Sequence, residues 1–379
     1  MNFDLSEEHE EFRNVVRDFA DNEIRPHVEA WDRDHYFPID TVKQMGDMGL
    51  FGLVFPEKYG GADADFTTLC VAIEELARVD SSMAITLSAG VGLGAMPVYA
   101  FGTEDQREEW LPDLVAGRTL GAFGLTEPDA GSDAGATRSK AKRDGDDWVI
   151  NGTKAFITNS GTEMTSIVTV TAKTDLGISA FVIPAGSDGL EVEPAYRKMG
   201  WHASDTHGLV LNDCRVPEAN LLGTEGKGFH QFLATLDDGR IAIAALAVGL
   251  AQACLDESVE YAKTRQAFGG PIGRNQAVSF ACADLSVQLE AARLLTYRAA
   301  WLKDQSRPFK QEAAIAKLHA TEAAVSATRV ATQIFGGYGF IDETPVSRFY
   351  RDAKILEIGE GTSEIQRLVI SRGLGLPVA

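Results

Sequence analysis

Hydrophobic positions near the start of the chain recur with helical spacing. Phe12, Val15, Val16 and Phe19 follow the i, i+3, i+4, i+7 rule, which predicts one apolar helix face directed at the core. Ser6 is the expected N-cap of this helix, because its hydroxyl can accept a hydrogen bond from a backbone N–H of the first turn. Three further helices are expected over residues 40–50, 65–79 and 104–116.

From about residue 118 the pattern changes to short β-branched segments. Residues 166–172 and 179–184 are expected strands, and residues 209–217 alternate between apolar and polar positions. Asn151-Gly152 lies between two apolar runs and predicts the two-residue turn of a hairpin. Several short strands at this spacing predict a small sandwich or barrel.

The helical pattern returns at about residue 226. A long apolar-rich helix is expected to include Asp237 and the thirty or so residues that follow it. Further helices are expected over residues 276–304, 311–335 and 363–371, with glycine-rich breaks at 269–273 and 336–339. Helices joined by short loops favour an antiparallel bundle.

The order of these segments predicts the fold class. Helices and strands are segregated along the chain, which favours a multi-domain α+β fold over a doubly wound α/β fold. We expect an N-terminal all-α domain over residues 1–117, a middle β-barrel or sandwich domain over 118–225, and a C-terminal four-helix bundle over 226–379. The motif GVGLGA at 90–95 satisfies G-x-G-x-x-G/A, but it lacks the preceding strand that a dinucleotide-binding turn requires. A glycine-rich helix contact is therefore its favoured interpretation.

Composition and charge narrow the classes of function. The chain has 379 residues, of which 45% are hydrophobic, and its formal net charge is −20. DNA and anionic lipid repel so acidic a chain, so neither nucleic acid nor a membrane surface is an expected partner. The sequence has no run of about 18 apolar residues, so we expect no membrane span.

The spacing of the cysteines and histidines indicates the cellular compartment and whether the chain binds a metal. The four cysteines and seven histidines show neither disulfide nor metal-ligand spacing. The first residues, MNFDLSEEHEEF, are acidic and lack the apolar core of a signal peptide. We therefore expect a reducing, cytoplasmic setting and no metal site.

Two segments carry residue types suited to ligand binding. FGLTEPDAGSDA at 123–134 is expected to leave a strand, turn at Pro128 and expose backbone N–H groups that can cradle a phosphate or a flat ring. Taken alone, it is also compatible with a polar hairpin loop. In the second segment, 333–366, Glu360 has glycine on both sides, which leaves room for a substrate against its carboxylate. The alternative is that Glu360 is an ordinary solvated loop acid.

These segments resemble the signatures of a known family, the acyl-CoA dehydrogenases. Residues 123–134 resemble the first signature, and the order of helices, strands and bundle agrees over essentially the whole chain. The second signature is matched by Gln333, Gly336, Gly337, Gly339, Phe340, Glu343, Arg348 and Asp352. The resemblance implies a flavoenzyme that oxidises acyl-CoA thioesters to 2,3-enoyl-CoA.

The resemblance also implies that FAD binds between the β domain and the bundle. The flavin segments are matched by Phe123, Leu125, Thr126, Gly131, Ser132, Phe156, Ile157 and Thr158, with the Thr158 hydroxyl expected near flavin N5. Contacts to the phosphates and the adenine half, partly across a subunit boundary, are matched by Arg265, Phe268, Gln276, Gln333, Phe335, Gly336, Gly337, Thr362 and Glu364. A guanidinium such as that of Arg265 suits bidentate recognition of phosphate, although a surface ion pair is its ordinary use.

The chemistry that the resemblance implies centres on Glu360. This residue matches the family's general base, which removes the α-proton while the β-hydrogen leaves as hydride to the flavin. One subfamily carries its base just before an arginine of the long helix, where this chain has Gly239; glycine is no base, so Glu360 keeps the role, with Asp238 as a weaker rival. Contacts to acyl-CoA are matched by Ser132, Asp237, Asp238, Gly239, Arg240, Gly361 and Arg372.

Gly359 departs from the family pattern, because most relatives carry tyrosine there. The missing ring is expected to widen the acyl pocket and to favour short branched or bulky acyl groups. The expected partners are an acyl-CoA, an electron-transfer flavoprotein and further copies of this chain in a homotetramer, a dimer of dimers. Two alternatives stay open: an acyl-CoA oxidase that passes electrons to oxygen, and a CoA-binding protein that has lost catalysis.

Overall fold

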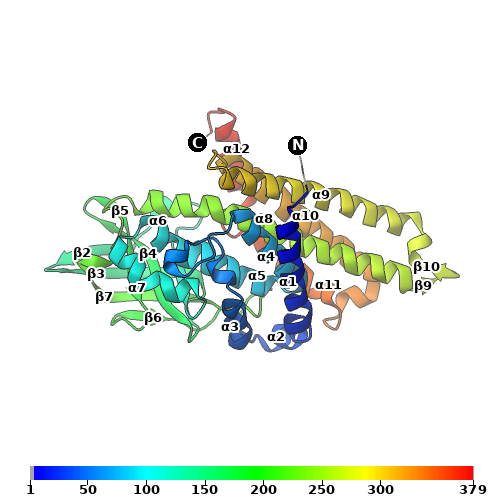
Figure 1. Ribbon diagram of the computed structural model, residues 1–379, viewed down its shortest axis with the longest axis horizontal. Coiled ribbons are helices and arrows are strands. Elements are labelled where there is room, and N and C mark those ends of the chain that lie inside the picture. The colour runs from blue at the N-terminus through cyan, green and yellow to red at the C-terminus, as the bar shows by residue number, and fades with distance from the viewer. Residues whose placement is uncertain (1–3, 379) are drawn as a thin grey trace.

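The structure, a computed structural model, describes residues 4–378 and has three parts (Figure 1). A β domain lies at one end, the long C-terminal helices extend to the other end, and the N-terminal helices pack along the middle. The N-terminal helices are α1 (Glu7–Phe19), α2 (Val28–Asp34), α3 (Ile39–Asp47), α4 (Phe66–Val79), α5 (Ser81–Ala89), α6 (Met96–Phe101) and α7 (Glu104–Val115). The predictions of α1, α3, α4 and α7 are confirmed; the sequence analysis missed α2, α5 and α6.

Ser6 caps the N-terminus of α1, as predicted, but the buried apolar face of this helix is narrower than the predicted one. The Ser6 hydroxyl accepts a hydrogen bond of 3.2 Å from the His9 backbone N–H. Val16 is fully buried, but Val15 is 56% exposed, so its assignment to the core face was wrong. Val15 lies one step around the helix from Val16, about 100° away, and this rotation carries its side chain past the edge of the packed face.

The middle part is a β domain, as predicted. Its strands are β1 (Leu120–Gly124), β2 (Lys140–Asp144), β3 (Asp147–Thr158), β4 (Thr165–Thr174), β5 (Gly177–Pro184), β6 (Leu190–Val192), β7 (Thr206–Pro217) and β8 (Leu221–Leu222). They form one eight-stranded sheet in the order β6-β7-β3-β2-β4-β5-β8, with β1 paired in parallel with β4. The sheet has a hydrophobic core of its own that includes Trp148, Ile150 and Phe181.

The predicted hairpin turn at Asn151-Gly152 was wrong, because both residues lie inside the continuous strand β3. The hairpin of this region joins β2 to β3 through Gly145-Asp146, where Gly145 has a φ of 66°. Gly152 is needed for close packing instead: a Cβ there would lie 2.1 Å from the Ser139 Oγ. The same dipeptide that favours a turn therefore marks an irregularity within a strand.

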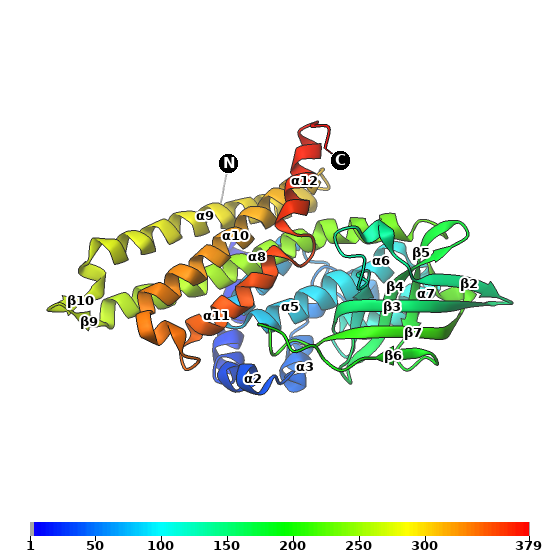
Figure 2. The same ribbon diagram turned by 180° about the vertical axis from the view of Figure 1, so that it is seen from behind.

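The C-terminal part is helical, as predicted. Its elements are α8 (Gly228–Thr264), β9 (Gln266–Ala267), β10 (Gly270–Pro271), α9 (Gln276–Asp304), α10 (Lys310–Phe335), η8 (Gly336–Phe340), α11 (Pro345–Ala353), η9 (Lys354–Glu357) and α12 (Ser363–Gly373). Figure 2 shows α8, α9 and α10 side by side, with the small β9–β10 hairpin at the end farthest from the sheet. The sequence analysis missed α11.

The two helical parts share one hydrophobic core. Leu69 and Ile73 of α4 belong to the same buried cluster as Leu246 and Leu250 of α8. Two helical stretches, Ser81–Phe101 and Gly228–Thr264, are long and apolar enough to cross a membrane, but 67% and 78% of their most apolar windows are buried inside the fold. Such burial is typical of core helices, and the expectation of no membrane span stays a prediction.

The glycine-rich segment 90–95 forms the π-helical turn η4 (Gly90–Ala95) between α5 and α6. A Cβ on Gly94 would lie 2.7 Å from the Gly121 carbonyl oxygen of β1. The glycine therefore permits close packing of helix on strand, and the interpretation of this segment as a helix contact is confirmed.

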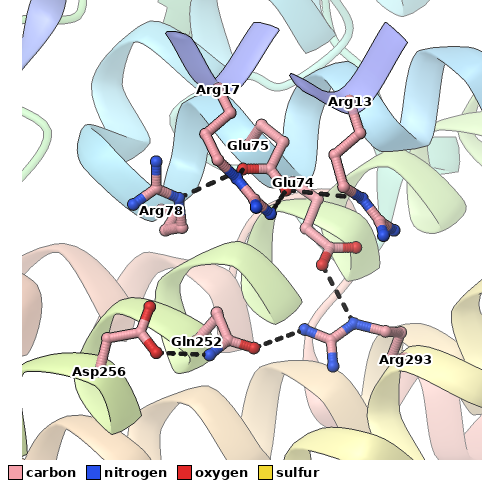
Figure 3. A pocket seen from close by; sticks show the side chains of 8 residues that line it. All are labelled: Arg13, Arg17, Glu74, Glu75, Arg78, Gln252, Asp256 and Arg293. Atoms are coloured by element: carbon pink, nitrogen blue, oxygen red, sulfur yellow. Dashed lines mark hydrogen bonds and ion pairs between the residues drawn. The ribbon is translucent and has the colours of Figure 1, made fainter. Parts of the chain in front are cut away.

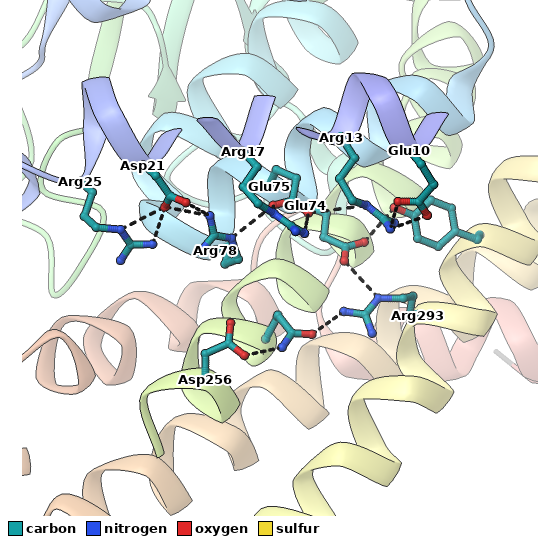
Figure 4. A network of polar contacts seen from close by, with 12 residues as sticks. Glu10, Arg13, Arg17, Asp21, Arg25, Glu74, Glu75, Arg78, Asp256 and Arg293 are labelled. Carbon is teal, nitrogen blue, oxygen red and sulfur yellow. Dashed lines mark hydrogen bonds and ion pairs between the residues drawn. The ribbon is translucent and has the colours of Figure 1, made fainter. Parts of the chain in front are cut away.

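A network of arginines and carboxylates ties α1 and α4 to the bundle (Figure 3). The Arg17 guanidinium donates two hydrogen bonds to Glu75, at 2.9 and 2.8 Å, and Arg293 donates to Glu74 at 3.0 Å and to Gln252 at 2.8 Å. Figure 4 follows the same network toward the end of α1. The groups line a cavity of about 450 Å³. Because these two guanidiniums already bind protein partners, we assign the network a structural role.

A second buried ion pair holds the loop after β1. Lys154 Nζ lies 2.8 Å from Glu127 Oε1, and their side chains are 0% and 4% exposed. Glu127 also accepts a hydrogen bond of 3.1 Å from the Ser139 backbone N–H. Burial alone would raise the pKa of Glu127, but hydrogen bonds, first from Lys154 and then from Thr137, lower that pKa to about 2.

Replacing Glu127 with alanine should destabilise the β domain strongly. The substitution leaves the buried Lys154 without its carboxylate, and breaking such a pair typically costs about 3–5 kcal/mol. Calorimetric unfolding measures the loss. The control is Glu191→Ala on exposed β6, which should change stability by less than about 0.5 kcal/mol. Equal effects of the two variants would contradict the account.

Candidate active site

Glu360 lies in the turn between η9 and α12, with its backbone in the left-handed region. Its φ is 51°, and that of Gly361 is 95°. A residue other than glycine adopts such a φ at a cost, and these conformations concentrate at functional sites. The glycines on both sides of Glu360 therefore help to form a tight turn that directs one carboxylate into the bundle.

The Glu360 carboxylate is buried against Gly239 of α8. A Cβ on Gly239 would lie 1.8 Å from Glu360 Oε2, so the carboxylate fills the space that this glycine leaves. Glu360 as a whole residue is partly exposed, yet its Oε2 is shielded from solvent and has no hydrogen-bond partner in the described residues. Burial raises the pKa of Glu360 to about 7, although the positive charges of Lys317 and Arg240 act in the opposite direction.

The neighbouring acids of α8 are engaged in ion pairs. Arg240 is buried and pairs with Asp237, while Asp238 pairs with Lys303 of α9 at 2.9 Å. Gly239, and not Asp238, faces the Glu360 carboxylate. The geometry thus favours Glu360 over Asp238 as the available base.

The structure brings the two flavin-matching segments of the β domain together. The Ala155 backbone N–H donates a hydrogen bond of 2.9 Å to the Thr126 carbonyl, which links the loop after β1 to the end of β3. Phe123 stacks on Phe232 of α8, with ring centroids 4.0 Å apart. Phe123 and Leu125 thus serve as packing, whereas Gly131 and Ser132 are exposed.

Phe156 is turned out of the sheet. Its φ is 62°, its side chain is 66% exposed, and the pairing of β3 with β7 shifts register between Lys154 and Ile157. Such a bulge redirects a side chain, which here leaves an aromatic face free for a planar ligand. Ile157 is buried and Thr158 is half-buried at the end of the strand.

A second cluster forms at the far end of the bundle. Arg265 lines a cavity of about 460 Å³ together with Phe335, Gly336 and Gly337, and its guanidinium lies 5.6 Å from the centre of the Tyr338 ring. Phe268 at the tip of the β9–β10 hairpin is fully exposed. Gln276 at the start of α9 and Gln333 near the end of α10 are also exposed. Figures 1 and 2 show this end opposite the β domain, so one chain does not unite the two clusters.

The predicted site residues in and next to α12 lie at opposite ends of that helix. The Thr362 hydroxyl caps α12 by accepting a hydrogen bond of 3.3 Å from the Ile365 N–H, and Glu364 lies exposed in the first turn. Arg372 lies exposed in the last turn, and the length of the helix places it roughly 15 Å along the axis from the Glu360 turn. The structure therefore does not bring Arg372 to Glu360.

The residues present fit a flavin dinucleotide. An exposed aromatic ring held by a bulge and a glycine-lined cavity with a guanidinium supply two different kinds of contact. A guanidinium matches the diphosphate, and an aromatic face matches the fused ring.

Sequence reasoning missed Lys317 and Gln366, two fully buried polar residues beside Glu360. Both donate hydrogen bonds of 2.8 Å to the Gly361 carbonyl. The sequence does contain a signal for Lys317. It shares a helical face with Ala313, Ala314 and other small residues of α10, and a charged lysine on such an apolar face is unusual.

Comparisons with known proteins agree along the chain. Models of the acyl-CoA dehydrogenase N-terminal, middle and C-terminal domains match residues 6–118, 122–214 and 226–375. The probable acyl-CoA dehydrogenase YngJ of Bacillus subtilis (strain 168) is 52% identical, covering 99% of this chain and 100% of that protein. The structure of butyryl-CoA dehydrogenase from Megasphaera elsdenii has a TM-score of 0.96 and 44% identity, covering 99% and 100% of the two chains. A structure described as the electron transferring flavoprotein of Acidaminococcus fermentans has a TM-score of 0.96 and 44% identity, covering 99% of both chains.

A double-mutant cycle tests the contact between Gly239 and Glu360. Alanine is favoured over glycine in a helix interior by about 1 kcal/mol, but the new methyl group at position 239 overlaps the Glu360 carboxylate, so Gly239→Ala should gain less than this amount or lose stability. In a Glu360→Ala background the overlap is gone, so the same substitution should show the full gain. Thermal unfolding of the four proteins gives the coupling energy. Equal changes in both backgrounds would show that the carboxylate does not occupy this space.

Proposed function

The chain belongs to the acyl-CoA dehydrogenase family, so it is an oxidoreductase that acts on acyl-CoA thioesters, and we propose that Glu360 is its general base. The observation that carries this proposal is the buried, unpartnered carboxylate in the space beside Gly239. A pKa of about 7 suits a base that must be ionised before the reaction and protonated after it.

The substrate would lie against Glu360 with its α-carbon toward the carboxylate. Glu360 accepts the α-proton, and its own backbone N–H donates to the thioester carbonyl oxygen, where negative charge develops. Bound FAD supplies the acceptor for the β-hydride, because no amino-acid side chain accepts a hydride, and the product is a 2,3-enoyl-CoA. Asp238 is a poorer base, since Lys303 already holds its carboxylate.

Two groups of residues would hold FAD. The ring system is held by the exposed face of Phe156, the Thr158 hydroxyl, and the accessible loop of Gly131 and Ser132. The phosphates and adenine would be held by the cavity of Arg265, Phe335, Gly336 and Gly337. Phe268, Gln276 and Gln333, which lie close to these residues in sequence, would add to the contact. Thr362 and Glu364 lie at the start of α12, beside the Glu360 turn and not beside the Arg265 cavity, and they would contact the flavin phosphates there.

This division of the cofactor contacts calls for a second copy of the chain. The Arg265 cavity lies at the end of the bundle farthest from the sheet, whereas Phe156 belongs to the end of β3 that adjoins α5, so a partner must bring its Arg265 end to this chain's β domain. α9 offers a surface for such contact: Phe280, Val287, Leu294 and Trp301 are seven residues apart and 43–70% exposed. An apolar stripe with heptad spacing is typical of helix association. We expect a homotetramer built as a dimer of dimers.

The acyl group and the electron acceptor complete the proposal. A Cβ on Gly359 would lie 3.4 Å from the nearest atom, the Ile355 carbonyl oxygen, so the position is open on its outer side and suits short branched acyl groups. As the electron acceptor we propose an electron-transfer flavoprotein, the partner that the family resemblance implies; the description of one similar solved structure names such a protein. An enzyme that passes electrons to this flavoprotein should form negligible peroxide in air, whereas an oxidase would form it steadily.

The free cysteines bear on the cellular compartment. Cys70 and Cys254 are buried free thiols, which suits the expected reducing cytoplasm.

Glu360→Gln tests the base directly. The variant should purify with its yellow flavin and bind acyl-CoA, but anaerobic bleaching of the flavin should slow by about 10²–10⁴-fold, because the amide cannot accept the proton. A panel of straight and branched acyl-CoAs measures the reaction and the chain preference together. Glu23→Gln on the exposed surface is the control. Unchanged bleaching in Glu360→Gln would assign the base elsewhere.

Val287→Glu tests the α9 stripe. A carboxylate in the middle of an apolar interface should reduce the oligomer to smaller species and lower the flavin content, since part of the FAD contact comes from the partner. Light scattering gives the mass, and absorbance gives the flavin content. Val15→Glu is the matched control, because Val15 is 56% exposed on α1, outside the stripe. An unchanged oligomer in Val287→Glu would refute the role of this surface.

A further inference from the structure

Lys317 is a buried lysine on α10 that the reaction scheme above does not use. Its side chain is fully buried, and its Nζ donates a hydrogen bond of 2.8 Å to the Gly361 carbonyl. Within residues 4–378 it forms no ion pair with a carboxylate. A buried ammonium costs free energy that an apolar side chain of similar size would not cost, so packing alone does not explain this lysine.

The hydrogen bond falls on the turn that carries Glu360. The Gly361 carbonyl also accepts a hydrogen bond of 2.8 Å from Gln366 Nε2, which in turn reaches the Glu360 carbonyl at 3.3 Å. Glu360 and Gly361 both have positive φ angles. Lys317 on α10 and Gln366 on α12 therefore clamp a strained turn from two different helices.

The charge of Lys317 also bears on the Glu360 carboxylate. Lys317 is the largest of the charges that oppose the effect of burial on the Glu360 pKa. Burial lowers the pKa of Lys317 to about 8, and Glu360 raises it in turn. Each of the two groups thus favours the charged form of the other.

The other buried cations on the helices packed against α10 are paired with carboxylates. Arg240 of α8 pairs with Asp237, and Arg348 of α11 pairs with Asp80 at 3.3 Å. The carboxylate in each of these pairs reduces the field of its cation. Among the buried cations described on α8, α10 and α11, Lys317 differs because its hydrogen-bond partner is a carbonyl.

We propose that Lys317 is a positioning residue for the catalytic base: it fixes the Glu360–Gly361 turn and supplies the positive charge that favours the ionised, proton-accepting form of Glu360. The inference rests on the proposed role of Glu360. Lys317 itself does not touch the reacting atoms in this scheme. A purely structural lysine would affect stability or the overall rate, but it would not shift the pH at which the base titrates.

The test compares holoenzyme variants by the pH dependence of anaerobic flavin bleaching with butyryl-CoA. In the wild type the rate should fall as the pH drops through about 7, because Glu360 must be ionised to act. Lys317→Met removes the charge and the donor, so the acidic limb should move up by about one pH unit. This corresponds to about a tenfold slower reaction at pH 6 and a much smaller loss at pH 9.

Two variants act as controls for this shift. Lys317→Arg keeps the positive charge and a donor, and its acidic limb should stay within a few tenths of a unit of the wild-type position. Lys43→Met removes one charge from the exposed surface of α3 and should leave the limb unmoved. A uniform loss of rate in Lys317→Met with an unshifted limb would overturn the inference and leave a structural role.

The outcomes separate this inference from the function on which it rests. Absence of bleaching in the wild type with any acyl-CoA contradicts the proposed function, whereas a normal wild type with an unshifted Lys317→Met profile contradicts only the role of Lys317. If the variants do not fold, NMR titration of lysines labelled with ¹³C at Cε in the wild type decides. A Lys317 that is protonated at pH 7 and responds to Glu360→Gln supports the proposal, and a neutral Lys317 at that pH overturns it.

Discussion

The carboxylate of Glu360 lies in the space that Gly239 leaves on the longest helix, and this contact sets the requirements for much of the surrounding structure. A side chain at position 239 of α8 would displace the Glu360 carboxylate. The helix therefore carries glycine at this position, although glycine is unfavourable in a helix interior. The turn must adopt positive φ angles to aim the side chain inward. Burial in this position raises the pKa of Glu360 toward neutrality, and that change turns an ordinary acid into a candidate base.

The same arrangement explains why several buried polar groups converge on one turn. Lys317 and Gln366 hold the Gly361 carbonyl, while Arg240 is restrained by Asp237. The base is thus placed by elements from α8, α10 and α12, which pack into one core. The proposed cofactor contacts are arranged differently: the Arg265 cavity lies at the end of the bundle far from the β domain, so we propose that association of copies completes them.

Periodicity and composition predicted the order of the three parts and most long helices, because these depend on local pattern. They failed at Asn151-Gly152, where close packing on Ser139 replaces the expected turn, and at Val15, where a rotation of one residue separates core from surface. The glycines on both sides of Glu360 indicated a candidate site, and the resemblance to the acyl-CoA dehydrogenases indicated that Glu360 acts there as a base. The partnership of Glu360 with Lys317 depends on which faces of α10 and α12 meet, and no local pattern encodes that pairing.

The most direct test of the account is a crystal structure of the holoenzyme with an acyl-CoA analogue in which sulfur replaces the β-carbon, so that no hydride can leave. The account predicts a Glu360 carboxylate oxygen within about 3–3.5 Å of the analogue's α-carbon, on the face opposite the flavin. A Glu360 side chain turned away from that carbon, with Asp238 or another carboxylate in its place, would contradict it.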